Sequence, residues 1–143
     1  MIVNGILSIK GRNVVTIGPN QTMGEAARIL SEKRIGALLV QDGQKLFLGI
    51  VSERDIVRAI SARGAGALDE PVSRFMTEKV TTCTTQTPIN DVMEVMTQGK
   101  FRHIPVVEDG TLLGIVSIGD VVKMRLEEIE AEAQAIRDYI ATA

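Results

Sequence analysis

The second half of this chain repeats the first, and this duplication limits the possible folds more than any other feature of the sequence. Residues 36–43 (GALLVQDG) align with residues 103–110 (HIPVVEDG), and residues 49–57 (GIVSERDIV) align with residues 114–122 (GIVSIGDVV). The first pair is offset by 67 residues and the second by 65, so the first copy carries two extra residues after Asp42-Gly43. Such length differences are tolerated in surface loops. We therefore expect one fold unit used twice.

Each copy predicts the same order of elements, β-α-β-β-α, because short apolar runs alternate with stretches of helical periodicity. A hairpin turn is expected at the Asp-Gly of each copy, and a second helix at the Ser-x-x-Asp that follows. The strands are expected at residues 13–17, 37–40 and 46–51 of the first copy and at 80–84, 104–107 and 112–116 of the second. One copy of roughly 50 residues buries too little surface to fold alone. We therefore expect both copies to pack into one mixed α/β (α+β) module.

Capping signals mark the first helix of each copy. Thr22 with Glu25 predicts a capping box, and Thr87-Pro88 predicts a threonine N-cap with proline at the first helical position. Between the copies, residues 61–68 are rich in Gly and Ala and predict a loop, and residues 69–76 predict a short helical turn. The expected domains are a first repeat at 8–62, a linker with a short helix at 63–76, a second repeat at 77–126 and a C-terminal helical extension at 127–143.

The C-terminal residues predict a helix of about five turns with one apolar face. The apolar residues are spaced 4, 3, 4, 3 and 4 apart, at Val122, Leu126, Ile129, Ala133, Ile136 and Ile140. Glutamates lie beside this stripe, at Glu127, Glu128, Glu130 and Glu132. Two interpretations remain open: the helix folds back on its own core, or it pairs with a second copy of the chain. Fewer than about three heptads are too few to decide between them.

Residues that could carry catalysis are scarce. The chain has one histidine (His103), one cysteine (Cys83), one tyrosine, three phenylalanines and no tryptophan. A metal site built from several His and Cys ligands and an intrachain disulfide are therefore excluded. The sequence also lacks the Gly-x4-Gly-Lys-Ser/Thr loop of nucleotide hydrolases and the Gly-x-Gly-x-x-Gly turn of dehydrogenases. We expect a protein that is not an enzyme.

The charge and hydropathy of the chain limit its partners. A formal net charge of −2 argues against binding a nucleic-acid backbone, and four aromatic residues make a poor platform for stacking bases. No apolar stretch approaches the ~18 residues of a membrane span, and the N-terminus has no basic signal-peptide start. We therefore expect a soluble, cytoplasmic protein with no nucleic-acid or membrane partner.

Both copies carry Gly-Ile-Val-Ser-x-x-Asp at the junction of a strand and a helix, with Ser52 and Asp55 in the first copy and Ser117 and Asp120 in the second. This pattern is itself a helix-capping signal. It also suits a nucleoside phosphate, because free N–H groups at a helix N-terminus attract a phosphate, and a carboxylate accepts hydrogen bonds from the two ribose hydroxyls. From the residues alone, capping and ligand binding both remain open.

The second copy also has a charged pair, Arg102-His103, between a helix and an apolar strand. The arginine fork fits phosphate oxygens, whereas a satisfied histidine at the rim of the core is the alternative for His103. The first copy has Ile35-Gly36 in the aligned positions, and its Arg54 is replaced by Gly119 in the second copy. We expect the copies to differ in how they bind an anion, although Arg54 is equally explained as a solvated helix residue.

Taken together, these features resemble a tandem pair of CBS domains, over about residues 8–126: the two β-α-β-β-α copies, the Asp-Gly hairpins, the Gly-Ile-Val-Ser-x-x-Asp junctions and the Arg-His-Ile-Pro-Val-Val run. The resemblance implies a pseudo-twofold module with two clefts. It further implies that these clefts bind adenosine derivatives, namely AMP, ADP, ATP, NAD(H) or S-adenosylmethionine, and that modules dimerise.

The resemblance also implies roles for individual residues. Asp55 and Asp120 would bind ribose hydroxyls, with Ser52 and Ser117 beside the ribose or the phosphate. Arg102 and His103 would lie near the phosphates, as would Arg54 if it contributes to binding. The adenine walls would come from Lys10, Val15, Ile35, Gly36 and Ile115 in the Asp120 cleft and from Thr77, Thr82 and Ile50 in the Asp55 cleft.

The leading hypothesis is a regulatory homodimer that binds AMP, ATP or NAD(H), needs no other cofactor and signals to an unidentified protein partner in trans. The alternative is a structural oligomerisation module whose Ser-x-x-Asp turns only cap helices. A response to nucleotides would separate the two.

Overall fold

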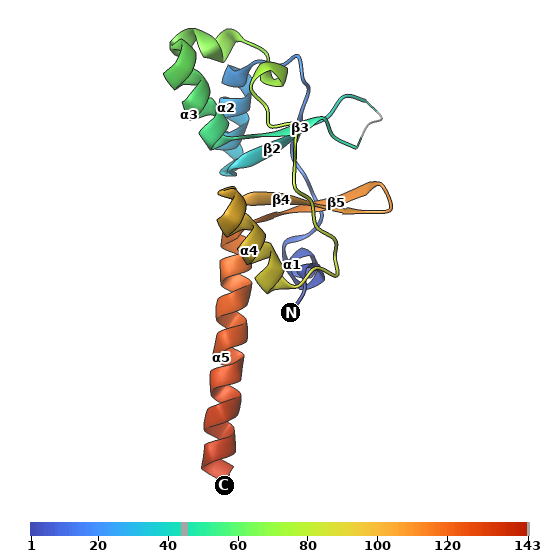
Figure 1. The fold of residues 1–143 in the computed structure, drawn as a ribbon, viewed down its shortest axis with the longest axis vertical. Coiled ribbons are helices and arrows are strands. Elements are labelled where there is room, and N and C mark those ends of the chain that lie inside the picture. The colour runs from blue at the N-terminus through green and yellow to red at the C-terminus, as the bar shows by residue number, and fades with distance from the viewer. Residues whose placement is uncertain (44–45, 143) are drawn as a thin grey trace. The chain divides into compact units, whose positions relative to one another are not determined.

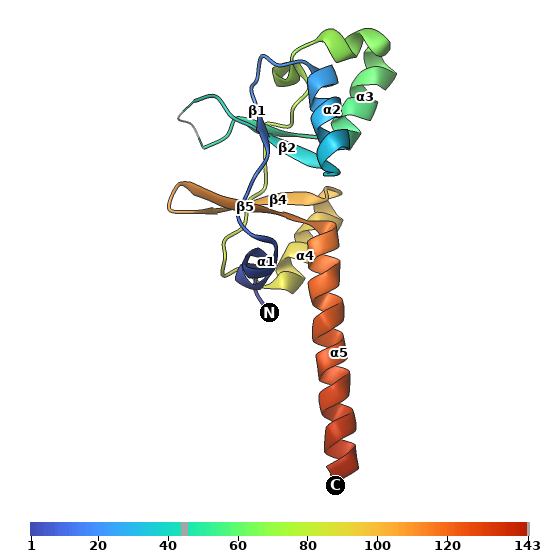
Figure 2. The ribbon, with the colours of Figure 1, turned by 180° about the vertical axis from the view of Figure 1, so that it is seen from behind.

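The computed structural model describes residues 1–43 and 46–142, which form two compact units (Figures 1 and 2). Unit 1 contains Met1–Arg12, Thr82–Asp109 and Leu113–Ala143, and unit 2 contains Asn13–Thr81 and Gly110–Leu112. Unit 2 thus holds the first copy of the duplicated sequence and unit 1 holds the second.

Unit 2 has the predicted order of elements. The elements are β1 (Thr16–Ile17), α2 (Met23–Lys33), β2 (Ala37–Val40), β3 (Gly49–Ser52), α3 (Glu53–Arg63) and two 3-10 helices, η1 (Ala65–Asp69) and η2 (Val72–Arg74). The sheet order is β1-β2-β3, with β1 and β2 parallel and β2 and β3 antiparallel. All four residues of β2 are buried, and Leu38 and Val40 pack with Met23, Val51 and Val72 into an apolar core.

Unit 1 repeats this arrangement with one difference. Its elements are α1 (Val3–Lys10), α4 (Ile89–Gly99), β4 (His103–Glu108), β5 (Thr111–Ser117) and α5 (Ile118–Thr142). The strand expected at residues 80–84 is reduced to a single parallel bridge between Cys83 and Val106. Buried residues of α1, α4, β4 and α5 form the core, among them Ile6, Ile89 and Val121. A mixed α+β fold is therefore confirmed, with the β-α-β-β-α order visible in both halves.

The segment that leads into each copy packs on the other copy. Helix α1 precedes the first copy in the chain, yet it belongs to unit 1, where the N–H of Val3 donates to the carbonyl of Thr87 (2.9 Å). Likewise, η2 precedes the second copy and belongs to unit 2, where the N–H of Val72 donates to the carbonyl of Gln21 (2.8 Å). Val3, Ile6 and Leu7 form the buried face of α1.

The hydrogen bonds of the strands revise the alignment of the two copies. Ile17 pairs with Val40 in unit 2, and Cys83 pairs with Val106 in unit 1, both in parallel register. The equivalent strand residues are therefore 66 apart, one fewer than the sequence alignment gave. Sequence comparison does not detect this shift of one residue, because every position of the aligned runs ALLV and IPVV is apolar.

The same revision makes Arg102 the residue of the second copy that is equivalent to Gly36 of the first copy. The N–H of Glu53, the first residue of α3, donates to the carbonyl of Gly36 (3.1 Å), and the N–H of Ile118, the first residue of α5, donates to the carbonyl of Arg102 (2.8 Å). Arg102-His103 therefore corresponds to Gly36-Ala37 and not to Ile35-Gly36. The predicted hairpin turn of the second copy is present, with Asp109 (φ 50°) and Gly110 (φ 73°) both left-handed, as a two-residue turn requires.

Two local predictions were wrong. Residues 61–68 are not a loop. Helix α3 continues to Arg63, and the 3-10 helix η1 follows, with Ala67 fully buried. Thr87 does not cap α4, whose N-cap residue is Pro88 without a side-chain cap. The Thr87 hydroxyl instead accepts a hydrogen bond from the N–H of Thr84 (3.0 Å), because the tight turn before the helix places it there.

Helix α5 is long, and most of its apolar stripe is exposed. It has 25 residues, of which only Val121 and Met124 are buried among those described. Leu126 is 61% exposed and Ile136 is 61% exposed. Figures 1 and 2 show α5 continuing well past α1 and α4, the helices of its own unit that pack against its first turns. The stripe therefore does not fold back on the core of unit 1.

Candidate functional site

The Ser-x-x-Asp junction of unit 2 is a complete capping box. Ser52 is the N-cap residue of α3, and its Oγ accepts from the N–H of Asp55 (3.4 Å). In return, the Asp55 carboxylate accepts from the N–H of Ser52 (2.8 Å) and from its hydroxyl (3.1 Å), both on Oδ2. Asp55 is only 8% exposed, and its Oδ1 lies 3.9 Å from the guanidinium of Arg58. The cap places a buried carboxylate at the positive end of the α3 dipole, where a negative charge is stabilised.

The junction of unit 1 has the same cap and an additional cation. The N–H of Ser117 donates to Oδ2 of Asp120 (2.9 Å), and the N–H of Asp120 donates to Oγ of Ser117 (3.2 Å). The ammonium of Lys10, the last residue of α1, donates to the same Oδ2 (2.7 Å) and to the carbonyl of Ile115 (3.0 Å). Lys10 therefore connects α1, the end of β5 and the start of α5.

The pKa of Asp120 reflects these contacts. Burial acts to raise the pKa of this carboxyl, but hydrogen bonds from Lys10 and Ser117 and the charge of Lys10 together hold it below its usual value. Asp120 lies in a groove between α1 and α5. Besides Lys10 and Asp120, the groove is lined by Ile6, Ile9, Lys123, Met124 and Glu127. Of these residues, only Lys10 and Asp120 are expected from the sequence to contact a ligand.

The equivalent of Lys10 in unit 2 is Met76, so the two junctions differ in charge. Next to Met76, the backbone of Thr77 forms an antiparallel bridge with Ile50: the N–H of Ile50 donates to Thr77 (2.9 Å) and the N–H of Thr77 donates to Ile50 (2.8 Å). This contact leaves no room beside Gly49, where an added Cβ would lie 2.6 Å from the Thr77 carbonyl. A glycine is thus required here by close backbone approach, not by ligand binding.

The candidate phosphate-binding residues lie at the junctions but differ in exposure. Arg102 is exposed and directly precedes β4, and His103 is half-buried as the first residue of that strand. Arg54 is exposed in the first turn of α3. The backbone carbonyl of Arg102, which follows α4, accepts a hydrogen bond from the N–H of Ile118 at the start of α5, and the arginine side chain is exposed.

The structure brings together two groups of predicted site residues. One group is in unit 1 and the other is in unit 2: Lys10, Ile115, Ser117 and Asp120 form the first, and Ile50, Ser52, Asp55 and Thr77 form the second. The predicted walls that lie in the opposite unit are Val15, Ile35 and Gly36 for the Asp120 cleft and Thr82 for the Asp55 cleft. Clefts composed from both copies stay predictions.

The described residues contain neither a membrane-spanning helix nor a cluster of metal ligands. Across residues 1–43 and 46–142, no helix is long and apolar enough to cross a membrane. Within the same residues, no group of three or more His, Cys, Asp or Glu side chains could hold a metal ion. The one cysteine, Cys83, is buried in the core of unit 1, and burial raises the pKa of its thiol to about 11.

Comparison with known proteins identifies both halves of the chain. The family model of the CBS domain matches twice, over residues 6–62 and 72–127. The chain is 38% identical over 123 residues to an uncharacterized 17.7 kDa protein of Acidianus ambivalens, covering 85% of this chain and 73% of that protein. It is 36% identical to the mitochondrial CBS domain-containing protein CBSX3 of Arabidopsis thaliana, covering 85% of this chain but only 61% of that protein.

Solved structures share the fold, and some of them hold ligands. A CBS-domain containing protein from Agrobacterium tumefaciens is 48% identical with a TM-score of 0.86, over 87% of this chain and 99% of that chain. A CBS domain protein from Pyrobaculum aerophilum, 31% identical with a TM-score of 0.71 over 84% of this chain and 89% of its own, was solved with AMP. The CBS domain pair of protein MJ0100, 26% identical with a TM-score of 0.78 over 90% of this chain and 98% of its own, was solved with 5′-methylthioadenosine and S-adenosyl-L-methionine.

Proposed function

Because the chain belongs to the CBS-domain family and carries two copies of the domain, we propose that it is a regulatory module that binds an adenosine nucleotide. In this proposal the protein is not an enzyme: it acts in the cytoplasm as a homodimer and passes the binding signal to a protein partner in trans. The expected ligand is AMP, ADP, ATP or NAD(H), bound at one or both Ser-x-x-Asp junctions.

The observation that carries the proposal is the group of side chains at Asp120. The Asp120 carboxylate accepts hydrogen bonds from the Lys10 ammonium and from the Ser117 N–H, and the Asp120 N–H in the first turn of α5 donates to the Ser117 hydroxyl. A carboxylate suits the ribose hydroxyls, and an ammonium beside a helix N-terminus suits a phosphate. Two structural relatives, at 31% and 26% identity, were solved with ligands that contain adenosine, which supports the same chemistry here.

The energetics of such a site are reasonable. Micromolar binding requires about 8 kcal/mol. Charge-assisted hydrogen bonds contribute roughly 1.5–3 kcal/mol each, so one ribose carboxylate and two phosphate cations supply a large part of this. Burial of the adenine face against apolar residues would supply the remainder.

The proposal assigns the phosphate to Arg102 and His103 in addition to the Lys10 ammonium, with Arg54 as a cation of the first copy. This assignment separates a nucleotide from S-adenosylmethionine, which has no phosphate. Arg102→Gln is expected to weaken AMP binding about tenfold, as loss of one charge-assisted hydrogen bond predicts. Binding of 5′-methylthioadenosine should not change, so equal weakening of both ligands would contradict the phosphate assignment.

The primary experiment is a thermal-shift panel at millimolar concentrations of AMP, ADP, ATP, NADH, S-adenosylmethionine and GMP. Adenosine nucleotides are expected to raise the melting temperature and GMP is not. Mass spectrometry of small molecules released from the purified protein identifies any ligand that co-purifies. A flat response to every compound, with no released nucleotide, would refute the proposal.

Asp55→Asn and Asp120→Asn test the two ribose positions. The asparagine side-chain carbonyl can still accept a hydrogen bond from the serine N–H, so each variant retains much of the capping box while losing the charge that accepts both hydroxyls. Thr22→Ala is the matched control, because Thr22 caps α2 through the N–H of Glu25 (3.1 Å) at a helix without the ligand motif. Each aspartate variant should remove one binding event in a calorimetric titration, and Thr22→Ala should remove none.

The alternative function is a structural oligomerisation module, and one observation favours it. Both Ser-x-x-Asp motifs form reciprocal caps, which explains these residues without a ligand. The alternative predicts stable oligomers and no nucleotide response. The panel therefore decides between the two functions.

A further inference from the structure

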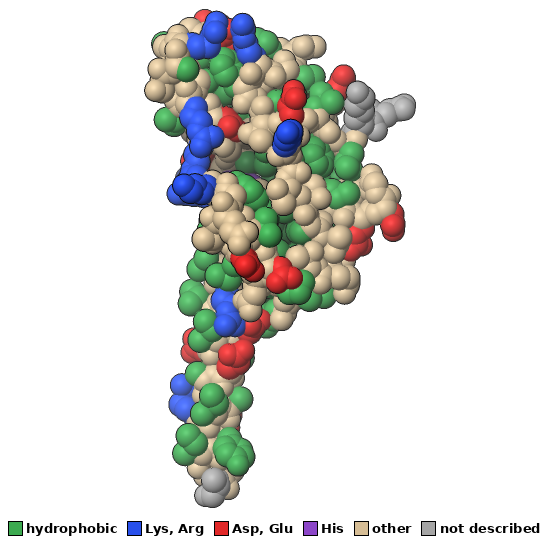
Figure 3. Space-filling view, in the orientation of Figure 1, with side chains coloured by type: hydrophobic (Ala, Val, Ile, Leu, Met, Phe, Trp, Pro, Cys, Tyr) green, Lys and Arg blue, Asp and Glu red, His purple; other side chains and the backbone are tan. Residues whose placement is uncertain are grey.

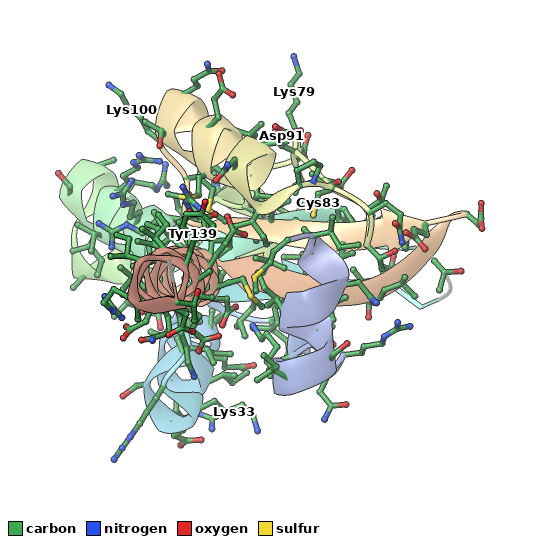
Figure 4. All side chains as sticks on the ribbon, turned by 90° about the horizontal axis from the view of Figure 1, so that it is seen from below. Lys33, Lys79, Cys83, Asp91, Lys100 and Tyr139 are labelled. Carbon is green, nitrogen blue, oxygen red and sulfur yellow. The ribbon has the colours of Figure 1, made fainter. Side chains whose placement is uncertain are left out.

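The second half of α5 presents an apolar stripe that nothing in the described chain covers. Along the stripe, Ile129 is 45% exposed and Ile140 is 67% exposed. Figure 3 shows hydrophobic side chains distributed along this part of the helix, and Figure 4 looks along α5 from its C-terminal end, with Tyr139 on its surface. An ion pair between the N-terminal ammonium and Glu128 (3.2 Å) joins α5 to the start of the chain, and the large apolar residues beyond it are exposed.

An unpacked helix with an exposed apolar face is unfavourable in water for two reasons. Helices of about 12–15 residues are marginal in water without tertiary packing. Exposed large aliphatic side chains are also unfavourable in water, because burying them is the main source of stability in packed helices. A second helix against the stripe would remove both costs.

The stripe has the spacing of a coiled coil. Leu126, Ala133 and Ile140 occupy the a positions of successive heptads, and Val122, Ile129 and Ile136 occupy the d positions. The a and d residues of a heptad face a single partner helix because their average spacing is 3.5 residues. In this frame Val121 and Met124, the two buried residues of α5, lie outside the stripe and face the core of unit 1.

The charges beside the stripe select both the partner and its direction. Arg125 and Glu132 are at g positions, and Glu130 and Arg137 are at e positions. In a parallel pair, each g residue faces the e residue five positions further along the partner helix. Arg125 would then face Glu130 of the partner subunit, and Glu132 would face Arg137 of the partner subunit. Both contacts are attractive, and symmetry gives each of them twice.

An antiparallel pair that keeps the whole stripe in contact places like charges together. In that arrangement e residues face e residues and g residues face g residues. Glu130 and Glu132 would each face its own copy, and Lys123 would face Arg137. Like charges facing each other in this way are unfavourable.

We propose that residues 122–140 of two copies of this chain form a parallel two-stranded coiled coil. The partner is a second copy because the e and g charges complement themselves. The proposal specifies the interface of the homodimer in the proposed function, but it does not depend on nucleotide binding. On pairing, Arg125 exchanges its contact with Glu128 of its own helix, and Arg137 exchanges its contact with Gln134 (2.7 Å), for the partner's carboxylates.

The first test places a charge in the centre of the stripe. Ile129→Asp is compared with Ala131→Asp, which adds the same charge to the same helix at an outward f position. At about 10 µM protein, sedimentation equilibrium should show a dimer for the wild type and for Ala131→Asp, and a monomer for Ile129→Asp, with dimer affinity reduced at least ~100-fold. Ile136→Asp repeats the test one heptad further along. A wild-type monomer, or an Ile129→Asp dimer, overturns the proposal.

The second test determines the direction of the helices. Glu132→Arg and Arg137→Glu each create repelling pairs in a parallel homodimer, whereas a mixture of the two variants restores every attraction. We expect each variant alone to dimerise about tenfold more weakly and the mixture to recover wild-type affinity as a heterodimer. Asp138→Arg, at an f position, is the charge control. Arg137→Glu that dimerises as well as or better than the wild type overturns the parallel direction.

A nucleotide thermal shift on Ile129→Asp separates this proposal from the proposed function. A monomeric variant that still responds to AMP supports both proposals. A monomeric variant in a protein that never responds to any nucleotide supports the coiled coil and refutes the nucleotide site.

Discussion

The contribution of the Lys10–Asp120 contact to the stability of unit 1 can be tested by a single substitution. Lys10→Met removes its ammonium and installs the residue found at the equivalent position of unit 2, Met76. The variant loses a 2.7 Å hydrogen bond to Asp120 and a 3.0 Å hydrogen bond to the Ile115 carbonyl. It keeps the apolar stem that packs between α1 and α5.

The magnitude follows from the burial of the pair. The side chains of Lys10 and Asp120 are 32% and 24% exposed, so the ion pair lies near the upper end of the surface range, about 1 kcal/mol. The bond to the carbonyl adds roughly 0.5–1 kcal/mol. We expect the free energy of unfolding to fall by about 1.5 kcal/mol at pH 7, which lowers a urea midpoint by roughly 0.7 M for a typical slope. Lys33→Met is the control, because Lys33 is exposed at the end of α2 and points into solvent in Figure 4.

A double-mutant cycle with Asp120→Asn isolates the pair. Unfolding of the wild type, both single variants and the double variant, followed by circular dichroism in urea, should give a coupling energy of about 1 kcal/mol. Because the pKa of Asp120 is lowered in the folded protein, its contribution is complete above the ordinary carboxyl value of 3.8 and is lost as the pH falls through the lowered value. The stability difference between wild type and Lys10→Met should shrink over the same range. The part that the Lys10 hydrogen bond to the Ile115 carbonyl contributes should remain at low pH. A coupling energy of zero, or a stability difference that does not shrink as the pH falls, would refute the assignment.

Three further predictions concern single positions. Cys83 should resist alkylation at pH 8 in the native protein and react in urea, because burial raises its pKa to about 11; fast native labelling would contradict its burial. Gly49→Ala should cost about 2 kcal/mol of unfolding free energy, since its Cβ would lie 2.6 Å from a backbone carbonyl, whereas Gly66→Ala, with open space around it, should be nearly neutral. Thr85→Val should raise the pKa of Glu108 toward 4.5 in an NMR titration, because hydrogen bonds from Thr85 lower that pKa; an unchanged pKa would show that other contacts set it.

Local features of the fold were predictable from the sequence because their causes are local. The caps at Thr22, Ser52 and Ser117 follow from residue types three positions apart, and the Asp109-Gly110 turn follows from two residues that tolerate a left-handed backbone. The buried face of α1 was predictable from the spacing of its apolar residues. In each case the signal lies within one turn of the chain.

Features that depend on distant residues were not predictable in the same way. The strand offset of 66 is fixed by the pairing of Ile17 with Val40 in unit 2 and of Cys83 with Val106 in unit 1, and apolar runs do not record it. The ammonium of Lys10 was expected at an adenine wall, but in this structure it pairs with Asp120, which is 110 positions away. No short-range pattern specifies that α1 packs with the second copy, so this ion pair follows only from the three-dimensional arrangement of unit 1.

The two junctions therefore share a backbone but differ in electrostatics, and this difference bears on ligand binding. At Asp55 the carboxylate is held by the Ser52 cap and by a guanidinium 3.9 Å away. At Asp120, a ribose hydroxyl would have to share the carboxylate with the Lys10 ammonium, which lies 2.7 Å from it, or displace that ammonium. Displacement costs free energy unless a phosphate oxygen accepts the hydrogen bond of the ammonium instead. Two sites with the same motif are consequently expected to bind one nucleotide with unequal affinity. Adenosine has no phosphate to accept a hydrogen bond from Lys10, so its affinity for the Asp55 junction relative to the Asp120 junction should be higher than that of AMP. Calorimetric titration of Asp55→Asn and Asp120→Asn with both ligands measures this ratio of affinities.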